Sequence, residues 1–221
     1  MVADLVTRRR GRALGAVVAC AVVCTALAAC GRGGDADAAA SDAGAQMAGV
    51  VREPPLDVGA VTLPDVAAGG APFALKAERG GLLLLYFGYT NCPDVCPTTL
   101  SDVKRIRRDL GADAARIGVA MATVDPARDT AGVLTSYLGH FFDDAHALRT
   151  DDLAQLAQAT GALGLTVTTR PTSDPGFYTV DHTATLYAVD PDGRVVVEWP
   201  FGTSAQAIES DVRRLLEQEA R

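Results

Sequence analysis

Apolar residues follow two different spacings in the first part of the chain. Residues 82–87 form a continuous apolar run after two glycines, and this predicts a buried central strand. Residues 117–124 predict a second strand, ended by an Asp-Pro pair. Between these strands, apolar residues recur at the spacing of one helix face and stop at a glycine: Leu100, Val103, Ile106, Leu110 and Gly111.

Two further helices and a long loop are predicted next. The second helix carries an apolar group made of Val133, Leu134, Tyr137, Leu138 and Phe141. The third opens at residues 151–152, turns Leu153 and Leu156 inward and closes at Gly161. Residues 164–181 contain two prolines and little pattern, which predicts a loop of the length that is often functional.

The C-terminal part predicts a hairpin and a helix. Residues 185–189 and 194–199 are two strands joined by the turn sequence Asp-Pro-Asp-Gly at 190–193. Thr203 with Gln206 forms a capping box for a last amphipathic helix. With short extended pieces around Val61 and Phe73, this order predicts an α/β fold of the thioredoxin-like type. We expect a central mixed sheet flanked by helices, with a C-terminal hairpin and helix.

The first thirty residues have the pattern of an export signal. Four arginines between residues 8 and 12 precede an uncharged, apolar stretch over residues 13–29. This stretch is shorter than the roughly 20 residues that a membrane span needs. It ends Leu-Ala-Ala before Cys30, which resembles the lipobox of bacterial lipoproteins, so we expect Cys30 to carry lipid. An ordinary signal peptide or an uncleaved anchor is the alternative.

The segment that follows predicts a tether and one domain. We divide the chain into a signal peptide at 1–29, a flexible Gly-, Ala- and Asp-rich tether at 30–55 and a domain at 56–221. The expected location is extracytoplasmic, lipid-anchored to the outer face of the cytoplasmic membrane. Removing residues 1–29 leaves 16 basic and 26 acidic side chains, a net charge of −10. That balance argues against a nucleic-acid partner.

The cysteine count directs attention to one loop. Of five cysteines, Cys20 and Cys24 fall in the predicted signal and Cys30 is the predicted lipid site, so the domain holds Cys92 and Cys96. Two thiols in an oxidising compartment form a disulfide, a redox pair or a metal site. Pro97 suits the first position of a helix, which makes Cys96 its expected cap and leaves Cys92 on the preceding loop. A positive helix end there favours thiolate.

The donor set favours copper over zinc. Two thiolates are too few for a closed zinc site, but they suit Cu(I). His182 begins a strand predicted beside the central one, where its imidazole supplies a third ligand suited to Cu(II). A stabilising disulfide between Cys92 and Cys96, with a structural His182, stays open as the alternative.

Several motifs together resemble the SCO/SenC copper chaperones. They are the segments at residues 87–90, 92–97, 123–130, 180–182 and 190–193, and the resemblance runs from about Leu82 to the C-terminus. It implies a thioredoxin-like domain that binds one copper, as Cu(I) or Cu(II), through Cys92, Cys96 and His182. Asn91 stands where some members carry histidine.

The resemblance also implies a partner. Members of the family deliver copper to the dinuclear copper site of cytochrome c oxidase subunit II, reduce its cysteines, or both. We therefore expect a membrane-tethered monomer that serves this subunit or another extracytoplasmic copper protein. Asp125 has two interpretations, an Asx turn that ends a strand or, by the resemblance, a partner surface near the metal. Asp94 is expected in a turn, and His140 and His146 are expected to be solvated.

Two enzyme functions compete with copper delivery. A thiol–disulfide oxidoreductase without a copper role would use Cys92 and Cys96 as its redox pair, although the CxxxC spacing and the absence of a proline before Thr183 count against a general one. A thiol peroxidase fits less well, because nothing in the sequence places an arginine beside a sulfur. Whether the chain is an enzyme therefore stays open.

Overall fold

The computed structural model describes residues 46–173 and 177–220. Residues 44–221 form one compact unit, while 1–43 fall in a separate one outside the described residues. The strands are β1 (Leu56–Asp57), β2 (Thr62–Asp65), β3 (Ala71–Ala74), β4 (Leu82–Gly88), β5 (Ile117–Thr123), β6 (His146–Leu148), β7 (Val167–Pro171), β8 (Tyr178–His182), β9 (Thr185–Val189) and β10 (Arg194–Pro200). The helices are α1 (Val95–Leu110), α2 (Ala131–Gly139), α3 (Leu153–Ala162) and α4 (Ala205–Glu219), with short 3-10 turns η1 (Val66–Ala68) and η2 (Gly111–Arg116).

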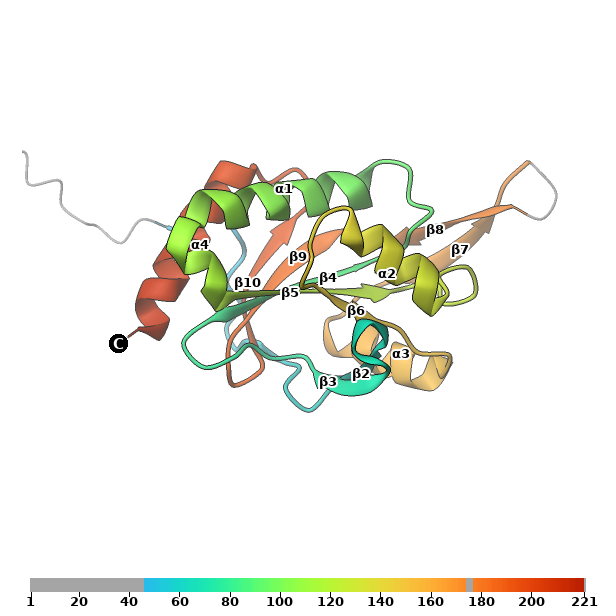
Figure 1. The fold of residues 1–221 in the computed structure, drawn as a ribbon, viewed down its shortest axis with the longest axis horizontal. Coiled ribbons are helices and arrows are strands. Elements are labelled where there is room, and N and C mark those ends of the chain that lie inside the picture. The colour runs from blue at the N-terminus through green and yellow to red at the C-terminus, as the bar shows by residue number, and fades with distance from the viewer. Residues whose placement is uncertain (1–45, 174–176, 221) are drawn as a thin grey trace, which may run out of the picture. The chain divides into compact units, whose positions relative to one another are not determined.

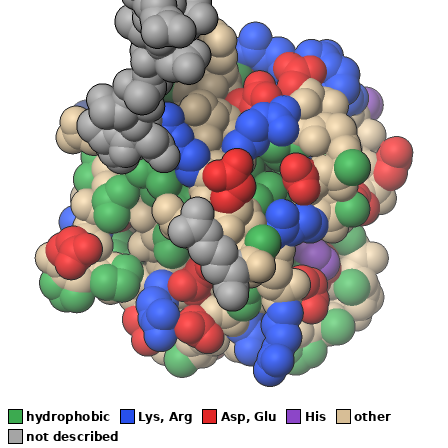
Figure 2. Space-filling model, turned by 90° about the vertical axis from the view of Figure 1, so that its left-hand side faces the viewer, with side chains coloured by type: hydrophobic (Ala, Val, Ile, Leu, Met, Phe, Trp, Pro, Cys, Tyr) green, Lys and Arg blue, Asp and Glu red, His purple; other side chains and the backbone are tan. Residues whose placement is uncertain are grey.

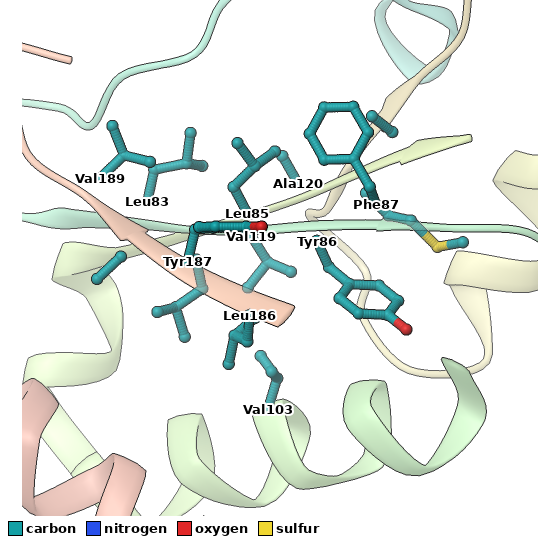
Figure 3. Close-up of a cluster of buried hydrophobic side chains, with 14 of the residues drawn as sticks. Leu83, Leu85, Tyr86, Phe87, Val103, Val119, Ala120, Leu186, Tyr187 and Val189 are labelled. Atoms are coloured by element: carbon teal, nitrogen blue, oxygen red, sulfur yellow. The ribbon is translucent and has the colours of Figure 1, made fainter. Parts of the chain in front are cut away.

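The central sheet is mixed, as predicted. Its eight strands run in the order β1-β10-β9-β4-β5-β6-β2-β3, with β4 parallel to β5 and antiparallel to β9. Every residue of β4 is buried, because the strand has neighbours on both edges and packed side chains on both faces. Figure 3 shows Tyr86 and Leu186 pointing toward Val103 of α1, while Leu85 and Phe87 point to the opposite side of the sheet. The continuous apolar run at residues 82–87 is therefore the middle of the core.

Helices α1 and α4 pack against each other over one face of the sheet (Figure 1). The buried residues of α1 include the four predicted from their spacing. At α3, Asp152 caps the helix as expected, but Leu153 is 68% exposed, so its predicted inward orientation is wrong. The cap of α4 is Ser204 rather than Thr203, since the Ser204 hydroxyl accepts from the amide of Ala207. Thr203 instead donates its hydroxyl to the carbonyl of Pro200.

A two-stranded hairpin stands where the sequence predicted a long loop. Strands β7 and β8 pair with each other in a separate sheet and extend from one end of the molecule (Figure 1). All five residues of β7 are exposed, and Val180 is the one fully buried residue of β8. These strands bury almost no apolar side chains, so their sequences lack the alternation of apolar and polar residues from which a strand is predicted.

The folded part begins before residue 56, the boundary that composition indicated. The amides of Ala48 and Gly49 donate to the buried carboxylate of Asp211, at 3.1 and 2.9 Å, and Trp199 donates its indole N–H to the same carboxylate at 2.9 Å. Val50 also pairs with Glu198 on β10. Backbone groups in this segment therefore have partners on the domain, which a free tether would lack.

Charges of both signs are mixed on the face shown in Figure 2. The described residues also form ion pairs such as Arg107 with Asp144 and Arg213 with Glu209. This face therefore presents no continuous basic field of the kind that phosphate backbones attract.

No helix within residues 46–173 and 177–220 combines the length and the apolar character that crossing a membrane requires.

Candidate metal and thiol site

The two cysteines lie in the loop between β4 and α1 and in the first turn of α1. Cys92 lies on the loop, as predicted, while Cys96 is the second residue of α1 rather than its cap. Asp94 holds the cap position but makes no side-chain cap bond. Instead, the amide of Cys96 donates to the sulfur of Cys92 at 3.2 Å, so that thiol satisfies a free N–H of the first helical turn. Both sulfurs thus lie at the N-terminal end of α1, where the helix favours negative charge.

His182 reaches the same place from the hairpin. Its Nε2 lies 3.7 Å from the sulfur of Cys96. On the other side of the ring, Nδ1 is 3.1 Å from the carbonyl oxygen of Thr183, which can only accept, so Nδ1 donates to it. The second ring nitrogen, Nε2, therefore faces the thiols, where it can donate to a thiolate or, without its proton, bind a metal.

Aromatic side chains hold the imidazole and the inner thiol. The rings of Tyr86 and Tyr89 meet the His182 ring edge-on, with centroids 6.1 and 5.9 Å away. Tyr86 is fully buried and donates its hydroxyl to the sulfur of Cys96 at 3.5 Å. Gly88 leaves the room for this contact, because a Cβ there would lie 2.6 Å from the Tyr86 ring and 3.1 Å from the sulfur of Cys96.

The pKa values of the two thiols are shifted in opposite directions. A hydrogen bond from Cys96, with further ones from His182 and from backbone amides, lowers the pKa of Cys92 to about 4 despite partial burial. The hydrogen bond that the Cys96 thiol donates to Cys92, together with burial, raises the pKa of Cys96. The pair therefore shares one thiolate, centred on Cys92 at the more exposed position.

The site opens into a shallow groove of about 430 Å³ between the cysteine loop and β8. Cys92, Asp94 and His182 are among the side chains that line it, and both cysteines are free thiols. A sulfur and an imidazole nitrogen that bind one ion lie about 3.5 to 4 Å apart, given bonds of about 2.3 and 2.0 Å. Cys96 and His182 have this separation. Across the described residues, however, no three ligand-type side chains already surround a common point. A metal that binds here must therefore draw the third ligand inward.

Asp125 is close to the site but does not offer a surface. It is 4% exposed, and its carboxylate accepts from the hydroxyl of Tyr178 at 2.7 Å and pairs with Arg128. Its amide donates to the hydroxyl of Thr123, so Asp125 belongs to the turn that ends β5. The interpretation of Asp125 as a partner surface is corrected by this burial.

Asp129 is a structural residue of the site to which the sequence assigned no role. Its carboxylate is fully buried and accepts from the amide and hydroxyl of Thr90, two residues before Cys92, and from the hydroxyl of Thr123. The sequence placed it in the segment at 123–130, but nothing in that pattern indicated a bond to the cysteine loop.

The other predicted residues lie outside this cluster. His140 is exposed, as expected. His146 was expected to be solvated too, but its Nδ1 lies 2.8 Å from the buried carboxylate of Asp65 and its ring packs on Phe73. Cys30 falls outside the described residues, as do Cys20 and Cys24.

Comparison with known proteins identifies relatives of the domain. A protein of Stutzerimonas stutzeri, provisionally named as copper-binding, is 38% identical over 123 residues, which are 55% of this chain and 59% of that protein. The chain thus spans less than two thirds of that relative. The copper-bound structure of ScoI from Bradyrhizobium japonicum is similar with a TM-score of 0.60 and 34% identity, covering 70% of this chain and 96% of the other. The apo Sco1 structure from Thermus thermophilus gives a TM-score of 0.65 and 30% identity, covering 78% and 96%.

The sequence profile of the SCO1/SenC family matches residues 66–217. This range contains β4, the cysteine loop and the hairpin that carries His182, together with most of the central sheet. The thioredoxin-like fold expected from the order of elements is also the fold of the solved Sco proteins. Because the match covers more than half of the chain and includes the whole thiol and imidazole cluster, the chain belongs to the SCO1/SenC family.

Proposed function

We propose that the protein is a copper metallochaperone that holds one copper ion as cargo at Cys92, Cys96 and His182. One observation carries the proposal: two thiols and the Nε2 atom of an imidazole meet at the edge of an open groove. The copper-bound structure of a relative 34% identical in sequence supports the same choice of metal.

The donor set fits copper in both oxidation states. Soft thiolate ligands select Cu(I), and an imidazole beside them suits Cu(II). Cys92 supplies a thiolate in the metal-free protein, since its hydrogen bonds lower its pKa to about 4. Cys96 keeps its proton there, and binding a metal would release it. Copper binding is therefore expected to release close to one proton near neutral pH.

The proposed acceptor is the dinuclear copper site of cytochrome c oxidase subunit II. The protein would deliver copper to this site, reduce its cysteines, or do both. In the reduction, the thiolate of Cys92 attacks a partner disulfide and Cys96 then displaces the second sulfur. The Cys92 thiolate and the Cys96 thiol become one disulfide, and the partner gains two electrons and two protons, one from Cys96 and one from water. The open groove on the Cys92 side gives a partner sulfur access to this attack.

We also propose that the protein acts outside the cytoplasm as a monomer held to the membrane by lipid on Cys30. The arginine-rich start, the uncharged stretch and the small residues before Cys30 support this anchor. The test compares wild type with Cys30→Ser in a bacterial host. Recovery of wild type in the membrane fraction and of the variant in the soluble exported fraction is expected. Equal membrane recovery of both proteins would exclude lipid on Cys30 as the anchor.

The test of copper binding compares the reduced protein with Cys92→Ser, Cys96→Ser and His182→Ala, and it uses His140→Ala as a matched control on an exposed histidine. Copper is measured per chain after removal of unbound metal. We expect about one copper in wild type and the control, loss in both serine variants, and a changed Cu(II) absorption spectrum in His182→Ala. Copper retention by both serine variants would contradict the proposal.

A thiol–disulfide oxidoreductase without a copper role is the second candidate. The observation in its favour is the thiolate of Cys92 beside the protonated thiol of Cys96, the arrangement of a reducing dithiol. Rapid turnover on general disulfide substrates that is unaffected by His182→Ala, together with no copper binding, would favour this function over copper delivery.

A further inference from the structure

The hairpin that carries His182 has little support of its own. An isolated two-stranded hairpin is at best marginally stable in water. Every residue of β7 is exposed, and β8 buries Val180 alone. His182 nevertheless lies 3.7 Å from Cys96, whose helix belongs to the main body. Side chains of the body must therefore hold the hairpin over the cysteine loop.

Arg128, in the turn after β5, contacts the first residue of β8 in several ways. Its Nη1 donates to the carbonyl of Tyr178 at 2.9 Å, and its guanidinium lies 3.7 Å from the centroid of the Tyr178 ring. Its Nε pairs with the buried carboxylate of Asp125, which in turn accepts from the Tyr178 hydroxyl at 2.7 Å. The first residue of β8 is thus held at its backbone, ring and hydroxyl.

The same guanidinium also faces the other aromatic support of the site. It lies 5.7 Å from the ring centroid of Tyr89, and that ring packs edge-on against His182. The Nη2 atom of Arg128 is buried and has no hydrogen-bond partner among the described residues. A guanidinium between two aromatic rings gains cation–π attraction in place of that bond. Arg128 therefore contacts both the beginning of β8 and the ring beside its last residue.

We propose that Arg128, oriented by Asp125, is a positioning residue that docks the β7–β8 hairpin and so keeps His182 within reach of the two thiols. The consequence for copper rests on the proposed function, whereas the docking itself does not. The buried carboxylate of Asp125 pairs with Arg128 and accepts from the Tyr178 hydroxyl. Its role is therefore to fix the guanidinium, not to contact a partner protein.

The docking is tested first without metal, by amide hydrogen exchange of the reduced protein. Arg128→Gln is compared with Arg149→Gln as a matched control, because Arg149 donates to the carbonyls of Pro126 and Asp129 in the same turn while its described bonds do not include the hairpin. We expect the hairpin amides of Arg128→Gln to exchange about tenfold faster or more, as for loss of a charged hydrogen bond. Amides of β4 should stay as in wild type, and Arg149→Gln should leave the hairpin unchanged.

Three results would overturn the proposal. The first is hairpin exchange in Arg128→Gln within about twofold of wild type, where tenfold is expected. The second is the same acceleration in β4 as in the hairpin, which would show a general loss of stability. The third is a wild-type hairpin that already exchanges like an unstructured peptide, because no docking would then exist to be lost.

The second test uses the Cu(II)-loaded protein and electron paramagnetic resonance. We expect Arg128→Gln to weaken the nitrogen hyperfine coupling of His182 in the direction of His182→Ala, while the thiolate charge-transfer band persists. Arg149→Gln should keep the wild-type spectrum, and Arg128→Lys, which keeps the charge without the planar fork, should fall between. Unchanged coupling in Arg128→Gln would refute the positioning role. Failure of wild type to bind copper would refute the proposed function instead, and the exchange experiment would still decide the docking.

Discussion

Replacement of Asp129 tests whether the cysteine loop is held by one buried carboxylate. The side chain is fully buried, and it accepts from the Thr90 amide at 3.1 Å, the Thr90 hydroxyl at 2.6 Å and the Thr123 hydroxyl at 2.5 Å. These bonds tie the segment before Cys92 to the end of β5. We predict that Asp129→Ala destabilises the protein strongly and that Asp129→Asn does so by less.

The expected magnitudes follow from the donors that each variant leaves without a partner. A hydrogen bond to a charged group contributes about 1.5 to 3 kcal/mol, and a buried donor left without an acceptor costs about 1 to 3 kcal/mol. Asp129→Ala removes the acceptor of three donors, so a loss of about 3 to 5 kcal/mol is expected. In Asp129→Asn the amide oxygen can keep the Thr90 N–H, and a threonine hydroxyl can turn to accept from the new NH₂ group. We therefore expect a loss of about 1 to 3 kcal/mol for this variant.

The assay is urea unfolding of the reduced, metal-free protein, followed by the fluorescence of Trp199. Asp151→Asn is the matched control, because that carboxylate is 79% exposed and pairs with Arg149 at the surface. Its loss should cost at most about 1 kcal/mol. The denaturant slope should stay constant, so that a change of midpoint reports stability. A free energy of unfolding for Asp129→Ala within about 1 kcal/mol of the wild-type value would refute the reasoning, because this variant leaves three donors without their acceptor.

Three further predictions concern the thiol site and the N-terminal segment. Cys92 should react with iodoacetamide as a thiolate at pH values well below the ordinary thiol pKa of about 8.5. Cys96→Ala should raise the pKa of Cys92, because it removes the hydrogen bond that lowers this pKa most; equal rate–pH profiles would contradict this. Gly88→Ala should lower the free energy of unfolding by about 1 to 3 kcal/mol, because the added Cβ would overpack against Tyr86 and Cys96. A Cβ at Gly132 would meet nothing within 4 Å, so Gly132→Ala should be neutral or stabilising in the same urea unfolding assay. Asp211→Ala should free the segment at 48–49 and speed trypsin cleavage after Arg52; unchanged cleavage would show that other contacts hold it.

Local patterns predicted the central part of the fold well. The run at 82–87 has apolar neighbours on both faces of the sheet, so burial left a continuous apolar run there, and the inward face of α1 left a helical period. The turn at 190–193 was also visible, because Asp190 accepts from the amides of Asp192 and Arg194 and Gly193 adopts a positive φ. Where an element is defined by its own hydrogen bonds or its own buried face, the sequence displays it.

Helix ends were less predictable because backbone groups accepted alternative partners. Pro97 fits the first turn of a helix at more than one position, and the structure starts α1 at Val95, two residues earlier than expected. The sulfur of Cys92 makes this start possible, since it accepts from the Cys96 amide in place of an ordinary cap. Cysteine is not among the usual capping residues, so composition alone gave no indication of this bond.

The half of the site that carries His182 depends on contacts that have no sequence period. Its hairpin buries little, so no alternation indicated the strands, and its attachment is made by one arginine 50 residues before Tyr178. A guanidinium can bond a carboxylate, a carbonyl and an aromatic face at once. Such a residue can therefore fix the position of a ligand without belonging to any patterned element. The thiols could be found because they lie four residues apart at the start of one helix, whereas the geometry that brings the imidazole to them depends on Arg128, Asp125 and Tyr178.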